Sequence, residues 1–243
     1  MLRVDLNADL GEGMGNDDAL LAIVSSASIA CGGHAGDRAS MTTAVRAALH
    51  YDVTIGAHPS YSDRENFGRV ALTIDPEVLR RELLIQVREL ASIASAQGGR
   101  VSYLKPHGAL YNTAMADPAV AGVVLDVAAT ALDVPLPILC LPGSVVERLA
   151  ADRGLTSVHE SFADRASTPE GALVPRSVPG AVLHSVEEIT ARIPDLAGAS
   201  QSICVHGDTP GAVQIAQAVR QRLRDVGYLI APFVGDELQE SGR

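Results

Sequence analysis

The stretch VDLNADL, residues 4–10, alternates apolar and polar side chains without a break. Successive side chains of a β-strand face opposite sides, so Asp5, Asn7 and Asp9 share one face of the predicted strand. Asp and Asn are poor strand formers, and a face that is only solvated would more often carry Thr, Lys or Glu. We therefore interpret the polar face as part of a functional site and expect the apolar face to lie against helices.

Short apolar runs of the same kind alternate with longer stretches of helical period along the chain. The predicted strands are Leu2–Asp9, Ser28–Cys31, Val53–Ala57, Val101–Lys105, Leu136–Cys140, Thr156–His159 and Ser202–His206, with Tyr228–Ala231 as an eighth candidate. The predicted helices are Asp17–Ser25, Ser40–Tyr51, Pro76–Gln97, Pro118–Ala131, Ser144–Arg153, Val186–Ile193 and Pro210–Val226. Repeated strand-then-helix units indicate parallel strands. Residues 1–243 are therefore expected to form a single-domain α/β fold, a parallel β/α barrel, with a doubly wound open sheet as the alternative.

Local signals place several of the helix ends. Asp75, Asp117 and Thr209 each precede a proline, which predicts a capping residue followed by proline at the first helical position. The long irregular region 161–180 carries three prolines and two glycines. Loops of this length in a compact domain are commonly lids or binding loops.

Composition limits the class of partner and the compartment. The formal net charge of −10 argues against nucleic acid and anionic membranes as partners. Acids in the first ten residues are incompatible with a secretory signal, and no apolar run reaches the roughly 20 residues of a membrane span. Three scattered cysteines favour a reducing, cytoplasmic location without a disulfide framework. Cys31 could be a nucleophile beside His34, but a buried structural thiol is favoured.

Titratable side chains gather where the predicted strands end, which is where β/α barrels build their active sites. Five of the seven histidines follow such runs, whereas His50 and His184 do not and are interpreted as structural. The strand-end candidates are His34 with Asp37, His58, Lys105 with His107, His159 with Glu160, and His206 with Asp208. Lys105 would be costly to bury alone, so it either pairs with the acidic cluster or binds a substrate carboxylate or phosphate.

The residues also bear on two further chemistries, nucleotide binding and metal binding. The sequence GEGMG, residues 11–15, is a weak match to a dinucleotide loop and is better explained as a glycine turn, and no Walker-type loop marks an ATP site. Whether the site binds a metal ion is left open by the sequence. The ligand types are present at Asp5, Asp9, His34, His58, His206 and Asp208, but no close-spaced motif such as H-E-x-x-H occurs.

Six stretches together resemble the LamB/YcsF lactam-utilisation family, which supplies the A subunit of bacterial 5-oxoprolinase. They are DLNADLGEGMG (5–15), ACGGHAGD (30–37), GAHPSYSDRENFGR (56–69), YLKPHGALYN (103–112), ESFADRASTPEGALVPR (160–176) and CVHGDTPGAV (204–213). They span nearly the whole chain in family order. The chain departs from the family pattern at Met14, where Phe is usual, at Val70, where Arg is frequent, and at Ser167, where Tyr is usual.

The resemblance implies a seven-stranded, TIM-like barrel related to polysaccharide deacetylases. It also implies ATP-dependent opening of 5-oxoproline to L-glutamate, with Mg expected beside ATP, in an assembly with subunits B and C. The expected catalytic roles are a cation at Lys105, a base at Asp208 or His206, groups for the ring nitrogen at Asp5, Asn7 and Asp9, and oxyanion donors at His58 and His107. Substrate-binding roles are expected for Glu12, His34, Asp37, Arg69, Glu160, Asp164, Arg165 and Arg176.

Two other functions remain open at this stage. The first is a metal-dependent deacetylase or amidohydrolase that needs neither ATP nor a partner. The second is a non-catalytic subunit that binds a small molecule. The substrate among lactams and related cyclic amides is likewise left open.

Overall fold

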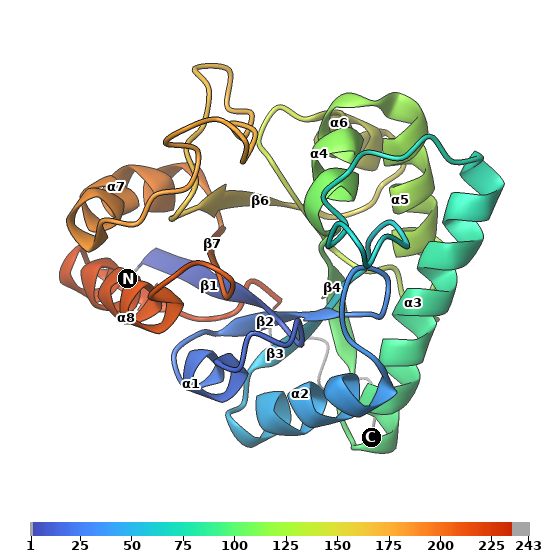
Figure 1. The fold of residues 1–243 in the computed structure, drawn as a ribbon, viewed down its shortest axis with the longest axis horizontal. Coiled ribbons are helices and arrows are strands. Elements are labelled where there is room, and N and C mark those ends of the chain that lie inside the picture. Colours follow the sequence, from blue (N-terminus) through green and yellow to red (C-terminus); the bar gives the residue numbers. More distant parts are fainter. Residues whose placement is uncertain (1, 235–243) are drawn as a thin grey trace.

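A closed parallel barrel forms the centre of the computed structural model, which describes residues 2–234 (Figure 1). Strand β1 (Leu2–Leu10) pairs in parallel with both β2 (Ser26–Ala30) and β7 (Ser202–His206), and each strand from β2 to β7 pairs with the next, which closes the ring. An additional strand, β8 (Tyr228–Ile230), pairs with β1 at Leu2–Val4, next to the ring. The predicted seven-stranded β/α barrel is confirmed, and the open sheet is excluded because β1 joins both edges.

Helices surround the barrel on its outer side (Figure 1). The strands are β1 (Leu2–Leu10), β2 (Ser26–Ala30), β3 (Thr54–His58), β4 (Val101–Leu104), β5 (Ile138–Cys140), β6 (Ser157–Phe162), β7 (Ser202–His206) and β8 (Tyr228–Ile230). The helices are α1 (Asp17–Leu21), α2 (Arg38–His50), α3 (Pro76–Ala96), α4 (Gly108–Ala116), α5 (Pro118–Thr130), α6 (Val145–Asp152), α7 (Val186–Ala199) and α8 (Ala212–Asp225).

Strand β1 has the two faces that its alternation predicts. Val4, Leu6, Ala8 and Leu10 are at most 1% exposed and belong to the hydrophobic core beneath the helices. The opposite face places Asp5, Asn7 and Asp9 in register with Ser202, Cys204 and His206 of β7. Because parallel strands keep this register, the polar face of β1 lies inside the barrel and continues onto β7.

Two of the three predicted helix caps are confirmed. The side chain of Asp75 accepts hydrogen bonds from the first backbone N–H groups of α3, and Asp117 does the same for α5. The prediction at Thr209 is wrong. Helix α8 begins only after Gly211, whose φ of 78° is left-handed, while the Thr209 hydroxyl donates to Asp164 at 2.6 Å. That hydroxyl therefore serves the interior of the barrel rather than a helix end.

Several elements differ from their predicted extent, and one helix was not predicted at all. Helix α4 was not predicted, because GALYNTAMA offers almost no polar face from which a helical period could be read. Helix α7 continues through Pro194 and stays packed by buried Ile189, Ile193 and Ala197, which recur every four residues on its inner face. Strand β6 extends beyond the predicted end at His159 as far as Phe162.

Among residues 2–234, no single helix is long and apolar enough to cross a membrane. Helices α4 and α5 reach that length and apolar composition only together, as a pair bent by 114°.

Candidate functional site

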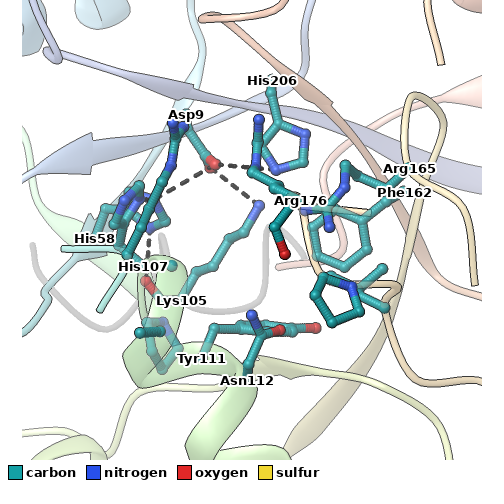
Figure 2. A pocket seen from close by; sticks show the side chains of 17 residues that line it. Asp9, His58, Lys105, His107, Tyr111, Asn112, Phe162, Arg165, Arg176 and His206 are labelled. Carbon is teal, nitrogen blue, oxygen red and sulfur yellow. Dashed lines mark hydrogen bonds and ion pairs between the residues drawn. The ribbon is translucent and has the colours of Figure 1, made fainter. Parts of the chain in front are cut away.

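A cavity of about 360 Å³ lies at the carboxyl ends of the barrel strands (Figure 2). Such a volume is at the lower end of the range for small-molecule sites. Its lining comes from the ends of β1, β3, β6 and β7, from the segment after β4, and from the loop after β6. The labelled lining residues are Asp9, His58, Lys105, His107, Tyr111, Asn112, Phe162, Arg165, Arg176 and His206.

Lys105 is 1% exposed and lies at the centre of a buried polar network. Its Nζ is 2.8 Å from Glu160 Oε1, 3.0 Å from Asp9 Oδ1 and 3.1 Å from Asn7 Oδ1. Burial alone would lower the pKa of Lys105, but the negative charges around it, led by Asp9, raise that pKa well above its usual value. The ammonium is therefore a charged partner of the acidic cluster, the first of the two interpretations offered by the sequence.

Asp9 links that network to the cavity. Its Oδ2 is 3.5 Å from His58 Nε2 and 3.9 Å from His206 Nε2, while Oδ1 faces Lys105. Burial disfavours the charged form, but His58 and then Lys105 hold the pKa of Asp9 well below its usual range. An ionised carboxylate is thus held in the wall of the cavity.

His206 and Asp164 form a dyad of the kind that orients a catalytic base. His206 Nδ1 lies 2.8 Å from Asp164 Oδ1, and Thr209 donates to the other oxygen of the same carboxylate. Burial opposes ionisation of Asp164, but His206 and Thr209 lower its pKa. With Nδ1–H donated to a carboxylate, the Nε2 of a neutral His206 carries its lone pair toward Asp9 and the cavity.

Backbone carbonyls fix the tautomers of His58 and His107. His58 Nδ1 donates to the carbonyl oxygen of Lys105 at 2.7 Å, and His107 Nε2 donates to that of Phe67 at 3.0 Å. The remaining nitrogens, His58 Nε2 and His107 Nδ1, face each other at 3.0 Å. In the neutral rings these nitrogens carry lone pairs and no proton. Neutral His58 and His107 therefore have no N–H to offer an oxyanion, unlike the donors expected from the resemblance.

Glu12 and His34 lie behind this histidine pair. Glu12 Oε1 is 2.9 Å from His34 Nε2 and 3.3 Å from His107 Nδ1. The His34 ring stacks on the His107 ring with centroids 3.6 Å apart. Burial, reinforced by the charge of Asp9, raises the pKa of Glu12 well above its usual value. The two residues therefore contact the histidine pair directly.

Arginines gather at the rim of the cavity. Arg69 forms an ion pair with Asp208, and Arg176 Nη1 lies 3.5 Å from the same Asp208 oxygen. Burial disfavours the charged form of Asp208, but Arg176 and Arg69 lower its pKa. A carboxylate that is held so firmly in its ionised, paired form is a poor proton acceptor.

Arg165 belongs to the long loop after β6 and is anchored by that loop. Its guanidinium donates to the carbonyl oxygens of Ala181 and Val174. Burial, reinforced by the charge of Arg176, lowers the pKa of Arg165 to about 10. The loop thus supplies part of the cavity wall, as its length and composition predicted.

Some predicted residues lie away from the cavity. Asp5 is one layer deeper, where Ser25, Ser26 and Ser202 donate to it, and burial raises its pKa to about 6. Asp37 is the exposed cap of α2, so we find no geometric support for its expected substrate-binding role. His159 points outward and pairs with Glu147 at 2.7 Å, because β6 runs on past it.

Two other sequence interpretations can be compared with the structure. Gly11, Gly13 and Gly15 have φ values of 75°, 82° and 77°, which confirms a turn that needs glycine backbone angles. Cys31 is buried, and burial raises its pKa to about 12. Its thiol therefore stays protonated, which agrees with the structural interpretation and not with a nucleophile.

Several lining or contacting residues were not among the predicted site residues. Tyr111 and Asn112 reach the cavity from α4, and Phe162 from the extended end of β6. Cys204 Sγ is 3.0 Å from Lys105 Nζ. The alternation of β7 contained a usable signal for Cys204, since it places this residue and His206 on the same face.

The chain is similar to known proteins of one family. The sequence model of the LamB/YcsF family matches residues 4–237. The chain is 46% identical to the 5-oxoprolinase A subunit of Mycobacterium avium (strain 104), over 96% of this chain and all of that protein. It is 45% identical to the 5-oxoprolinase A 1 subunit of Agrobacterium fabrum (strain C58), over 97% of this chain and all of that protein.

The chain is also similar to solved structures. The lactam utilization protein from Thermus thermophilus superposes with a TM-score of 0.87 and 35% identity, covering 96% of this chain and 100% of that one. The peptidoglycan deacetylase PdaC from Bacillus subtilis has a TM-score of 0.54 at 12% identity, covering 98% of this chain and 90% of that one, which shows a shared fold alone. On the extent of the family match and the identity to these relatives, the chain belongs to the LamB/YcsF family.

Proposed function

We propose that this chain is the A subunit of a 5-oxoprolinase and opens 5-oxoproline to L-glutamate, with ATP hydrolysis, in an assembly with subunits B and C. The names of the relatives support the activity. The observation that carries the proposal is that Asp9, Lys105 and His206, from three separate strand ends, converge on one small cavity rimmed by arginines. A small cavity with arginines at its rim suits a small anionic ring.

The chemistry explains why ATP would be coupled to this reaction. A five-membered lactam is an unreactive amide, and phosphorylation of its carbonyl oxygen would create an electrophilic carbon and a good leaving group. We place the ATP, with Mg, in the assembled enzyme, since the sequence carries no Walker-type loop. This chain then has to bind the ring, orient it and deliver water.

The geometry supports a division of roles among the cavity residues. Arg69 and Arg176 would bind the substrate carboxylate, which can take the place of Asp208 between them. His206 would act as the base that activates water, since Asp164 orients it and Asp208 is committed to arginines. Asp9 would accept the ring N–H.

Other residues would act through these. Lys105, Asn7 and Glu160 hold Asp9 in place and are positioning residues in this scheme. Asp5, one layer below, supports the interior of the barrel and does not reach the substrate.

The deciding experiment measures glutamate formed from 5-oxoproline by this chain alone and by the chain mixed with candidate subunits B and C, with and without MgATP. We expect turnover only in the complete mixture with ATP. Turnover by the lone chain without ATP would contradict the proposal and favour a stand-alone hydrolase. A mixture that assembles but stays inactive would favour a non-catalytic binding role.

The role of His206 is tested in the same assay. His206→Ala is expected to lower kcat by about 10²–10⁴, the usual contribution of a positioned base. His159→Ala is the matched control, because His159 lies outside the cavity and pairs with Glu147. Equal activities of the two variants would exclude His206 as the base.

A further inference from the structure

At the cavity wall, three ligand-type atoms surround a single point. They are Glu12 Oε1, His58 Nε2 and His107 Nδ1, with pairwise distances of 3.0, 3.3 and 3.9 Å. Ligands about 2.0–2.1 Å from a tetrahedral zinc ion are about 3.3 Å from one another. The spacing of the three atoms therefore matches one face of a tetrahedron around a metal ion.

The hydrogen bonds of the two histidines point the same way. The far nitrogen of each ring donates to a backbone carbonyl, so the near nitrogens of His58 and His107, 3.0 Å apart, are the ones left to hold a cation, either a shared proton or a metal ion. Metal-bound histidines typically have a fixed carbonyl partner on the other ring nitrogen, as both do here.

The charges around the site favour a cation as well. Asp9 and Glu160 place two buried carboxylates against one buried ammonium, that of Lys105, and the buried carboxyl group of Glu12 lies 3.9 Å from His58 Nε2. Burying unbalanced charge is costly. A divalent ion next to Glu12 and Asp9 would supply the missing positive charge, and Asp9 Oδ2, 3.5 Å from His58 Nε2, faces the same space.

His34 has a supporting position. Its Nε2 lies 2.9 Å from Glu12 Oε1 and its ring stacks face to face on His107. A ring stacked in parallel cannot aim its lone pair at an ion in the plane of its neighbour, whereas an Nε2–H can hold the Glu12 carboxylate. His34 is therefore a positioning residue for Glu12.

We propose that Glu12, His58 and His107 bind one divalent transition-metal ion, zinc by the chemistry of the donor set, with the fourth position open toward the cavity. Two histidines and one glutamate with an open position form the donor set of several catalytic zinc sites. His58, His107 and Asp9 line the cavity, so the open position would face substrate or water (Figure 2). The neighbouring group of Asp9, Cys204 and His206 does not compete, because the Lys105 ammonium already contacts Asp9 and Cys204.

The first test is the metal content of the full chain, purified without a histidine tag, desalted and measured by inductively coupled plasma mass spectrometry. We expect about one equivalent of zinc in the protein as purified. A sample stripped with a chelator and then reconstituted should bind about one equivalent of zinc or of cobalt. Cobalt should also give the visible d–d absorption of a four- or five-coordinate site. Wild-type protein that folds but retains no metal and gives no cobalt spectrum would overturn the proposal, leaving a shared proton as the cation.

Variants then locate the site. Glu12→Gln, which keeps the shape of the side chain, and His107→Ala should abolish stoichiometric metal, and His34→Gln should weaken affinity by about 10–100-fold. His159→Ala should bind like wild type. Metal retained by both ligand variants would overturn the assignment. If His107→Ala does not fold, cobalt titration of Glu12→Gln decides, and none of these measurements depends on lactam hydrolysis.

Discussion

The side chain of Lys105 shows how one buried charge holds several others. Its ammonium is within 3.0 Å of carboxylate oxygens of both Asp9 and Glu160, and all three residues are at most 4% exposed. Removal of one member leaves the others charged and without a partner in a water-poor interior, which costs more than the pair contributes. Stability at this site therefore depends on keeping the set complete.

Lys105→Met tests that argument, since it keeps an unbranched side chain of similar size and removes the ammonium group. We expect the free energy of unfolding in urea to fall by about 3–5 kcal/mol. Arg38→Met is the matched control, because Arg38 pairs with Glu89 at the surface and its loss should cost at most about 1 kcal/mol. Similar losses for the two variants would show that removing a charge from the buried network costs no more than removing one from a surface ion pair.

Asp5 makes stability depend on pH through a single buried carboxyl. Burial raises its pKa in the fold from 3.8 to about 6, so the folded chain holds a proton there that the unfolded chain has already lost. The free energy of unfolding should therefore fall as pH rises from about 4 to about 6, by at most about 3 kcal/mol, and this contribution should be flat above pH 6. Asp5→Asn should lack this component in urea titrations at each pH. Parallel pH profiles for the two proteins would contradict it.

At the scale of the strands, the barrel interior leaves no room for a side chain at Gly56 of β3. A Cβ built there would lie 2.1 Å from Cζ of Tyr103, the ring that fills the barrel from β4 and hydrogen-bonds to Ser28. Gly56→Ala should destabilise the fold by about 1–3 kcal/mol through overpacking. Gly198→Ala in α7, where a Cβ meets nothing within 4 Å, should be neutral or stabilising by up to about 1 kcal/mol.

A double variant makes the strand-packing argument specific. Tyr103→Leu empties the space that the new Cβ at Gly56 would enter, so the two changes together should cost less than the sum of the single changes. Additive costs in thermal or urea unfolding would mean that backbone strain in β3, and not contact with Tyr103, causes the loss.

The sequence predicted elements best where polar and apolar residues alternate cleanly. Strand β7 was predicted with both ends correct, and β1 to within one residue. A period of two tells which face a residue occupies but not where a strand stops. This is why β6 was predicted too short and His159 was expected at the site. Helix α4 was not predicted, because a nearly all-apolar segment shows no helical period of apolar and polar residues.

At the scale of the whole molecule, the sequence indicated which residues belong to the site better than it indicated their roles. Parallel barrels bring strand ends together, so Asp9, His58, Lys105 and His206 were predictable as one group. The depth of each side chain in the barrel, its partners and the tautomers of the histidines were not predictable, because they depend on contacts between segments far apart in the chain. Examples are the deeper position of Asp5, the arginine partners of Asp208 and the carbonyl partner of His107.

The rim of the cavity unites the most distant segments, and it should decide which small molecules bind. Arg69 follows β3, Arg176 lies in the loop after β6, and Asp208 follows β7, so these three residues meet only in the closed barrel, and with them the proposed carboxylate-binding site. Arg69→Gln should weaken 5-oxoproline binding to the isolated chain, measured by calorimetry, by about 10–100-fold, the value of a charge-assisted pair. The same variant should leave the affinity for 2-pyrrolidinone, which has the ring but no carboxylate, nearly unchanged. An equal loss of affinity for both ligands would mean that Arg69 shapes the cavity and does not bind the substrate carboxylate. Arg176 or Arg165 would then be the candidate for carboxylate binding.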